Sequence, residues 1–192
     1  PVQPQDIRLS LESASVYMTV YDSENRSCGR EGCLIPGASA AFTQTGDLSL
    51  TLPPVSGDAA SYRAVFHGIE DGNISCHLKA CQGDSEILSQ EVMEIQIEPH
   101  QILRSEVSVS LSQDDPAIVF GDTEAPQRTD GTPLAYDFDA DGDIGDDDIA
   151  RINAKWGVCQ GSPDYDPFYD LDDDGCVGFS DIMTVANGWY VP

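Results

Sequence analysis

The sequence predicts two parts of different class, a mainly β N-terminal sandwich and a small α module at the C-terminal end. Three observations lead to this prediction. Short segments of alternating apolar and polar residues recur along residues 1–121, no helical periodicity precedes residue 145, and an acidic internal repeat occupies residues 135–192. Residues 122–134 are rich in Pro, Thr, Gly and Asp, a composition typical of a linker between domains.

Six segments of the N-terminal part have the period-two pattern of half-buried strands. Apolar and β-branched residues alternate with polar ones, and Pro, Gly, Asn and Asp separate the segments. The segments are Ile7–Leu11, Val16–Val20, Leu48–Leu52, Tyr62–Phe66, Val92–Ile97 and Val107–Leu111. Six to eight short strands at this spacing favour an antiparallel sandwich.

The N-terminal part resembles the transthyretin-like sandwich of carboxypeptidase regulatory-like domains. That family has a strand, a proline-containing loop, a Gly-led strand and a Pro-rich turn before a Tyr-led strand. The corresponding segments here are Val16–Tyr21, Ile35-Pro36-Gly37, Gly46–Leu52, Pro53-Pro54 and Tyr62–Phe66. The alternative is a different immunoglobulin-like or jelly-roll sandwich.

The charge balance excludes two classes of partner. The chain has 34 Asp and Glu against 9 Lys and Arg, a net charge of -25. Nucleic acids and anionic membrane surfaces require cationic patches, so we expect neither as a partner. No apolar run approaches the length of a membrane span. The chain begins at Pro1 without a basic and apolar leader, so we expect any export signal to have been removed.

Six cysteines in a chain of 192 residues indicate an oxidising, extracellular location. We expect the disulfides Cys28–Cys33, Cys76–Cys81 and Cys159–Cys176, with crossed pairing between the first two loops as the alternative. The triplets that begin at Asn25 and Asn73 have the pattern of N-glycosylation sites, although such triplets also arise by chance.

The C-terminal part contains an internal repeat with an offset of 33 residues. Tyr136–Trp156 and Tyr169–Trp189 align without a gap, and nine of the 21 positions are identical. Residues 130–192 hold fifteen Asp but only one Arg and one Lys, so the repeat concentrates negative charge. A chain segment of this composition requires cations.

Each repeat has the spacing of a 12-residue calcium loop. Carboxylates at every second residue converge on one point, and a glycine at position 6 allows the chain to turn around the ion. Position 7 binds through its backbone carbonyl, and position 12 begins a helix and closes the coordination sphere. The first loop supplies Asp137, Asp139, Asp141, Asp143 and Asp148, and the second supplies Asp170, Asp172, Asp174, Cys176 and Asp181. We expect two Ca²⁺ ions, because Mg²⁺ is less suited to a loop of many carboxylates.

Two such loops, each followed by a helix and not preceded by a full one, resemble the dockerin module. Dockerins are calcium-dependent modules of extracellular bacterial proteins that bind the β-sandwich cohesin modules of scaffold proteins. The resemblance covers residues 135–190 and implies partner contacts at positions 10 and 11 of each loop. These positions hold Asp146, Asp147, Phe179 and Ser180. They differ from the Ser/Thr-like pairs of well-studied dockerins, which puts a standard cohesin partner in doubt.

The helices after the loops are expected to form a small core of their own. Each has apolar residues at i, i+3 and i+7, which share one helical face. These residues are Ile149, Ile152, Trp156, Ile182, Val185 and Trp189. Ile144 and Val177, at position 8 of each loop, should point into this core. Tyr136 and Trp189-Tyr190 should close the two ends of the module against each other.

The sequence does not support catalysis. His67, His77 and His100 belong to no triad or metal motif, and the chain has no phosphate loop, nucleophile elbow or cofactor fingerprint. Three functions remain. The first is a structural protein whose acidic module contacts the sandwich of the next copy and so builds a filament. The second is an adaptor or adhesin that docks onto a cohesin-like scaffold protein, and the third is a carbohydrate-binding module.

Overall fold

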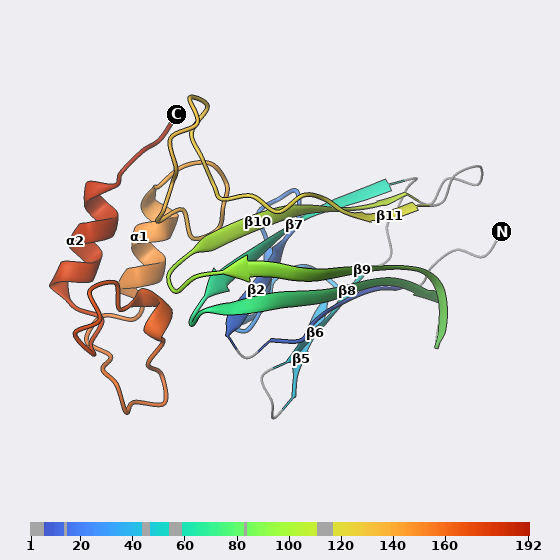
Figure 1. Cartoon of the computed structure of the whole chain (residues 1–192), viewed down its shortest axis with the longest axis horizontal. Helices are drawn as coiled ribbons and strands as arrows, with labels where there is room; N and C mark the ends of the chain where they lie inside the picture. Colours follow the sequence, from blue (N-terminus) through green and yellow to red (C-terminus); the bar gives the residue numbers. More distant parts are fainter. Residues whose placement is uncertain (1–5, 14, 44–46, 54–58, 83, 111–116) are drawn as a thin grey trace.

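The computed structural model describes residues 6–13, 15–43, 47–53, 59–82, 84–110 and 117–192. Within them the chain forms two antiparallel sheets and two short helices (Figure 1). The first sheet has the order β5 (Ser39–Phe42), β6 (Leu48–Leu52), β1 (Asp6–Leu11), β8 (Gly72–Gln82), β9 (Ser85–Ile97). The second has the order β11 (Ala117–Phe120), β10 (Ile102–Ser110), β7 (Ala59–Gly68), β2 (Val16–Tyr21), β3 (Ser27–Gly29), β4 (Gly32–Cys33).

The mainly β prediction is confirmed, and each of the six predicted strand segments lies in a strand. Leu111, Gly46 and Pro54, which belong to the predicted strand and turn segments, lie outside the described residues. In β1 the odd-numbered residues are buried and the even-numbered ones are half-buried, as period-two alternation requires. The inward side chains of both sheets form one core, which includes Leu9, Leu50 and Phe66.

The two sheets are tied together along one side by a side chain. Gln90 of β9 accepts a hydrogen bond from the backbone N–H of Phe120 at 2.6 Å. Its amide donates back to the Phe120 carbonyl at 3.3 Å. The last strands of the two sheets, β9 and β11, are therefore joined by a pair of bonds that resembles a step of a β-ladder.

The C-terminal part lies at one end of the sandwich and contains α1 (Asp146–Asn153), a 3₁₀ turn (Pro167–Tyr169) and α2 (Phe179–Asn187) (Figure 1). Phe138, Phe168, Ile152 and Val185 are buried in a second core, which is shared with the sandwich and is not a core of the C-terminal part alone. Tyr21, Val65 and Ile102 of the sandwich belong to the same core. The register places these three residues on the outer face of the six-stranded sheet, so the C-terminal part covers that face.

The segment before the first loop runs along β10. Arg104 and Glu124 form a β-bridge, and their side chains pair at 2.9 Å. A second bridge joins Gln127 to Pro133 and closes a turn. The boundaries at residues 121 and 135 stay predictions. No helix among the described residues is long and apolar enough to span a membrane.

Two of the three expected disulfides are present, Cys28–Cys33 and Cys159–Cys176. The expected bridge between Cys76 and Cys81 is wrong, because both thiols are free and buried. Both residues belong to β8, where five steps of extended chain separate them by about 16 Å. A disulfide requires Cα atoms within about 7 Å, so these two cysteines cannot pair.

The tryptophans also differ from their expected place. Trp156 and Trp189 are 52% and 50% exposed, whereas Ile152 and Val185 are fully buried. Because α1 ends at Asn153 and α2 at Asn187, the residues at i+7 fall beyond the helices and leave the buried face. Ile144 and Val177 do point into the core.

The ends of the module meet, but without Trp189. Tyr190 forms a β-bridge with Ile144, and Tyr136 lies over Gly188, where an added Cβ would meet its ring at 3.2 Å. Tyr136 and Tyr190 pack against the core, and the guanidinium of Arg128 lies 4.2 Å from the centre of the Tyr190 ring. The contact between the ends is therefore made by two tyrosines.

Candidate metal centre

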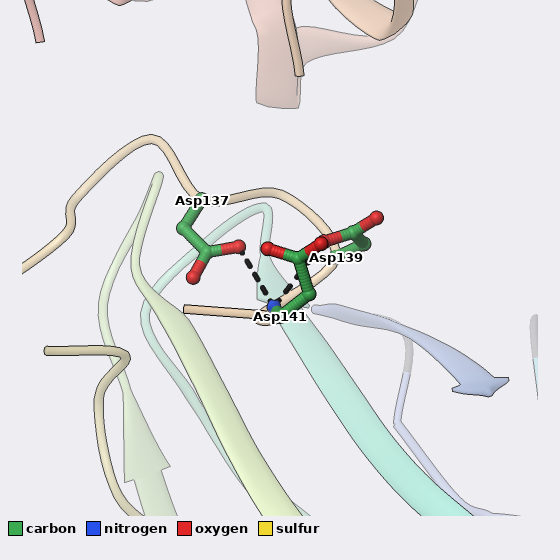
Figure 2. A group of neighbouring side chains, drawn as sticks. All are labelled: Asp137, Asp139 and Asp141. Carbon is green, nitrogen blue, oxygen red and sulfur yellow. Dashed lines mark hydrogen bonds between the residues drawn. The ribbon is translucent and has the colours of Figure 1, made fainter. Parts of the chain in front are cut away.

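The first loop gathers three carboxylates. Asp137, Asp139 and Asp141 each offer an oxygen, and these oxygens lie within 4.8 Å of one another (Figure 2). Asp137 and Asp139 are buried, and Asp141 is exposed. The backbone N–H of Asp141 donates to Asp137 at 3.0 Å and to Asp139 at 3.2 Å, which holds the side chains in a fixed arrangement.

The second loop repeats this arrangement. Oxygens of Asp170, Asp172 and Asp174 also lie within 4.8 Å of one another. The N–H of Asp174 donates to Asp170 at 3.1 Å and to Asp172 at 3.3 Å. Asp170 is buried, and the other two are exposed. The structure therefore brings together positions 1, 3 and 5 of both repeats.

The turn of each loop uses the same backbone conformations. Gly142 and Gly175, at position 6, have φ of 106° and 92°. Only glycine adopts such angles without strain, which explains its place in both repeats. Ala140 and Asp173, at position 4, have φ of 57° and 55° in the left-handed region. The repeat seen in the sequence is thus also a repeat of backbone geometry.

The aspartates at position 12 are buried at the third residue of each helix. One oxygen of Asp148 accepts from the N–H of Phe138 at 2.7 Å, and the other accepts from Gly145 at 2.8 Å. Asp181 makes the equivalent bonds to Leu171 and Gly178. These two aspartates are outside the two groups of three, but a carboxylate has about four lone-pair positions, so each retains capacity for a further contact.

Burial and mutual repulsion perturb the carboxylates of the first loop. Burial raises the pKa of Asp137 to about 8, and the neighbouring charges of Asp148 and Asp139 act in the same direction. Burial likewise raises the pKa of Asp148 to about 6. Both shifts mean that the ionised carboxylates lack a compensating charge. A cation among them would supply it.

The residues at position 7 are placed differently in the two loops. The side chain of Asp143 lies beside Gly145, whereas Cys176 is bonded to Cys159. A side chain that is engaged in a disulfide leaves the carbonyl of Cys176 as the group that it can offer to an ion. Binding through the backbone carbonyl at position 7 stays a prediction for both residues.

The remaining residues singled out in the sequence lie outside the two clusters. The expected partner contacts are all exposed; they are Asp146, Asp147, Phe179 and Ser180. Asn73 is exposed on β8. Asn25 uses its side-chain amide in two contacts: it donates to Asp139 at 3.3 Å and accepts from Arg63 at 2.6 Å. This use of the amide disfavours a glycan at Asn25.

Several residues near the first loop were not recognised in the sequence. Arg63, His67 and Arg104 come from the sandwich, and each contacts a backbone carbonyl of the loop. Arg151 of α1 lies 3.6 Å from Asp139. A signal was present in β7, where the apolar Val65 interrupts the alternation expected of a strand with one exposed face.

All the groups that converge in each loop are oxygens. Hard divalent cations prefer oxygen ligands, and carboxylates provide both ligand atoms and charge. The residues present therefore fit a hard cation at each of two sites. Arg151 beside Asp139 adds positive charge next to the first group of three.

Comparisons with known proteins identify no family. No family model matches the sequence, and no curated protein is significantly similar to it. A chain of a type II cohesin–X–dockerin complex from Acetivibrio cellulolyticus is 16% identical, with 93% of this chain and 83% of that chain covered and a TM-score of 0.26. A domain of unknown function, DUF4425, from Bacteroides vulgatus is 12% identical, with 58% and 100% covered and a TM-score of 0.27. Structural similarity this low carries no functional argument.

Proposed function

We propose that residues 135–192 bind two Ca²⁺ ions and that the chain is a non-catalytic, extracellular assembly protein. The observation that carries the proposal is the repetition of one loop geometry, with three converging carboxylates and a left-handed glycine in each copy. The resemblance of the sequence to the dockerin module supports the same reading. The two disulfides fit an oxidising compartment.

Calcium fits better than magnesium. Ca²⁺ accepts six to eight oxygens in flexible geometry at about 2.3–2.6 Å, whereas Mg²⁺ requires a near-ideal octahedron and retains water. Position 12 supplies a buried carboxylate beside each group of three, which increases the number of oxygens available. Asp148 and Asp181 would complete the two spheres together with the carbonyls of Asp143 and Cys176.

An assembly role is supported by the apolar surface of α2. Phe179 and Met183 lie one helical turn apart and are 69% and 38% exposed. Trp189 and Val191, in the chain after α2, are also exposed, to 50% and 55%. Exposed apolar side chains that gather on one helix are typical of a protein-binding surface. We expect its partner to be another copy of the chain, joined head to tail, which can propagate into a filament.

The second candidate function is that of an adaptor or adhesin that docks onto a cohesin-like scaffold protein through the same surface. A carbohydrate-binding role is disfavoured, because both tryptophans lie in the C-terminal part, and the sandwich has only Tyr and Phe for stacking on sugars. The polymerisation state distinguishes the first two candidates.

Calcium titration by calorimetry tests the metal sites. The unaltered chain should bind two ions, and Asp141→Ala and Asp174→Ala should each remove one. Asp146→Ala is the matched control, since it deletes an exposed carboxylate of the same region that is outside both groups of three. Binding of no ion, or equal loss in the control, would contradict the proposal.

Analytical ultracentrifugation and electron microscopy with calcium and then with chelator test the assembly role. Calcium-dependent polymers that Phe179→Asp abolishes support self-assembly. A monomer in both conditions would contradict it and leave the adaptor as the better candidate.

A further inference from the structure

Three consecutive backbone carbonyls of the first loop are bound by three side chains of the sandwich. Nε2 of His67 lies 2.7 Å from the carbonyl oxygen of Phe138. Arg63 donates to the next carbonyl, that of Asp139, at 2.9 Å, and Arg104 donates to that of Ala140 at 3.4 Å. We call Arg63, His67 and Arg104 the carbonyl-binding face.

This face is a product of the sheet register. Arg63 and His67 are four residues apart on β7, and Arg104 lies opposite Val65 on the neighbouring strand β10. Residues that share this register point to the same side of the sheet, which is the side that the C-terminal part covers. The three donors are therefore held at fixed spacing by a β-ladder before the loop arrives.

The side chains of Arg63, His67 and Arg104 act as hydrogen-bond donors to these carbonyl oxygens. Burial lowers the pKa of His67 to about 4, so the ring is neutral at physiological pH. Because a carbonyl only accepts, Nε2 must carry the proton in this contact. Arg63 also donates to Asn25, whose amide in turn donates to the carboxylate of Asp139. The sandwich thus binds both the backbone and one side chain of the loop.

The second loop is held differently. Its equivalent carbonyls belong to Leu171, Asp172 and Asp173, and no sandwich side chain within the described ranges donates to them. His100 instead contacts the carbonyl of Phe168, ahead of the second loop, at 3.1 Å, and the side chain of Asp173 at 3.5 Å. The two repeats are similar in sequence and loop geometry, but among the described residues only the first has three consecutive loop carbonyls bound by sandwich side chains.

In the structure the carboxylates of Asp137, Asp139 and Asp141 lie close to one another (Figure 2). In this wound form the loop presents its three carbonyls to the sandwich. Without a counter-ion, an ionised Asp137 bears the cost of burial and the repulsion of Asp148 and Asp139, which favours an opened loop. An opened loop no longer presents consecutive carbonyls at the spacing of the carbonyl-binding face.

We propose that the carbonyl-binding face is an interaction surface for the cation-loaded form of the first loop, so that cation binding there and attachment of the C-terminal part to the sandwich are one coupled equilibrium. The inference rests on the proposed function, since it requires that the loop binds Ca²⁺. Coupling is reciprocal: loss of the face must weaken cation binding at the first loop by the same factor by which the cation strengthens attachment. The second loop binds its cation independently of the face.

The test is calorimetric titration with Ca²⁺ in two backgrounds. Asp174→Ala leaves the first loop to be measured, and Asp141→Ala leaves the second. Arg63→Met should weaken binding at the first loop by about five- to tenfold and leave the second within about twofold. The direction is decisive, because removal of a nearby positive charge would by Coulomb's law alone strengthen cation binding. Lys79→Met is the control: it removes the same charge from the other sheet, where Lys79 pairs with Glu86.

The outcomes separate the two proposals. If the unaltered chain binds no Ca²⁺, the proposed function fails and this inference fails with it. If the chain binds two ions, but Arg63→Met strengthens the first site, leaves it unchanged or weakens both sites equally, the inference alone is overturned. Arg104→Met serves as the second variant should Arg63→Met not fold. An NMR signal from the Nε2 proton of His67 that is sharp with Ca²⁺ and lost with chelator is expected, and its persistence in chelator would also overturn the inference.

Discussion

Phe168 is the residue whose removal should most damage the contact between the two parts of the chain. Its side chain is 1% exposed. Its ring lies 4.6 Å from that of His67 and 5.2 Å from that of Tyr169, measured between ring centres. Phe168 therefore joins the outer face of the six-stranded sheet to the core of the C-terminal part.

The variant Phe168→Ala should lower the free energy of unfolding by about 3–5 kcal/mol, the range for a buried aromatic side chain that leaves a cavity. For a chain of this length, each kcal/mol shifts the melting temperature by about 2–4 °C. The expected fall is therefore about 6–20 °C, measured by scanning calorimetry in millimolar calcium.

Phe179→Ala is the matched control for this prediction. The same atoms are removed, but Phe179 is 69% exposed on α2, so the free energy of unfolding of the chain should change by no more than about 0.5 kcal/mol when it is measured on dilute, monomeric protein. If the two variants melt at the same temperature, Phe168 is not the packing centre that its burial indicates. If only one of two calorimetric transitions moves, the two parts do not unfold together.

Three further predictions concern the thiols, the pH and the second disulfide. Cys76 and Cys81 should resist a thiol reagent at pH 8 until the chain is unfolded, because both are buried and burial raises the pKa of Cys76 to about 12. Immediate labelling of two thiols would refute this. In chelator, the free energy of unfolding should rise as the pH falls from 8 to 6. The pKa of Asp137 is about 8 in the folded chain and near 4 when unfolded, so the folded state binds more protons in this range. Urea titrations at both pH values measure the free energy of unfolding. Replacing Cys159 and Cys176 by Ser should cost about 3 kcal/mol, since their bridge closes a 17-residue separation, and an unchanged melting temperature would contradict this.

The local parts of the fold were predictable from the sequence because each depends on neighbours in the chain. Alternation in Ile7–Leu11 reports a strand with one buried face, and the spacing of Asp137, Asp139 and Asp141 reports a loop that winds around a point. Both patterns lie within a dozen residues. The bridge between Cys28 and Cys33 is of the same kind, as these residues face each other on β3 and β4.

The parts that could not be predicted depend on contacts between distant segments. The short strands β3, β4 and β5 have too few residues to show a period. The free state of Cys76 and Cys81 follows from the continuity of β8, which the sequence analysis did not include among its strands. The carbonyl-binding face requires the register between β7 and β10, and no single segment contains that information.

Tryptophan placement shows a different limit. A helical period predicts which residues share a face only as far as the helix continues, and neither helix reaches its tryptophan. The chain that follows each helix makes other contacts and does not continue the helix. After α1, Gly157 donates to the carbonyl of Val177, and after α2, Tyr190 pairs with Ile144. The segment after each helix is thus hydrogen-bonded to the loop of the other repeat, and the helix ends before its tryptophan.

The bond pair between Gln90 and Phe120 has a consequence for how the sandwich meets other chains. An edge strand has unpaired backbone groups to which a strand of another chain can add, which leads to uncontrolled aggregation. The amide of Gln90 hydrogen-bonds to both backbone groups of Phe120, so these groups are not available to an added strand between β9 and β11. Growth by strand addition is obstructed at this point, which leaves ordered association to surfaces of defined shape, such as that of α2.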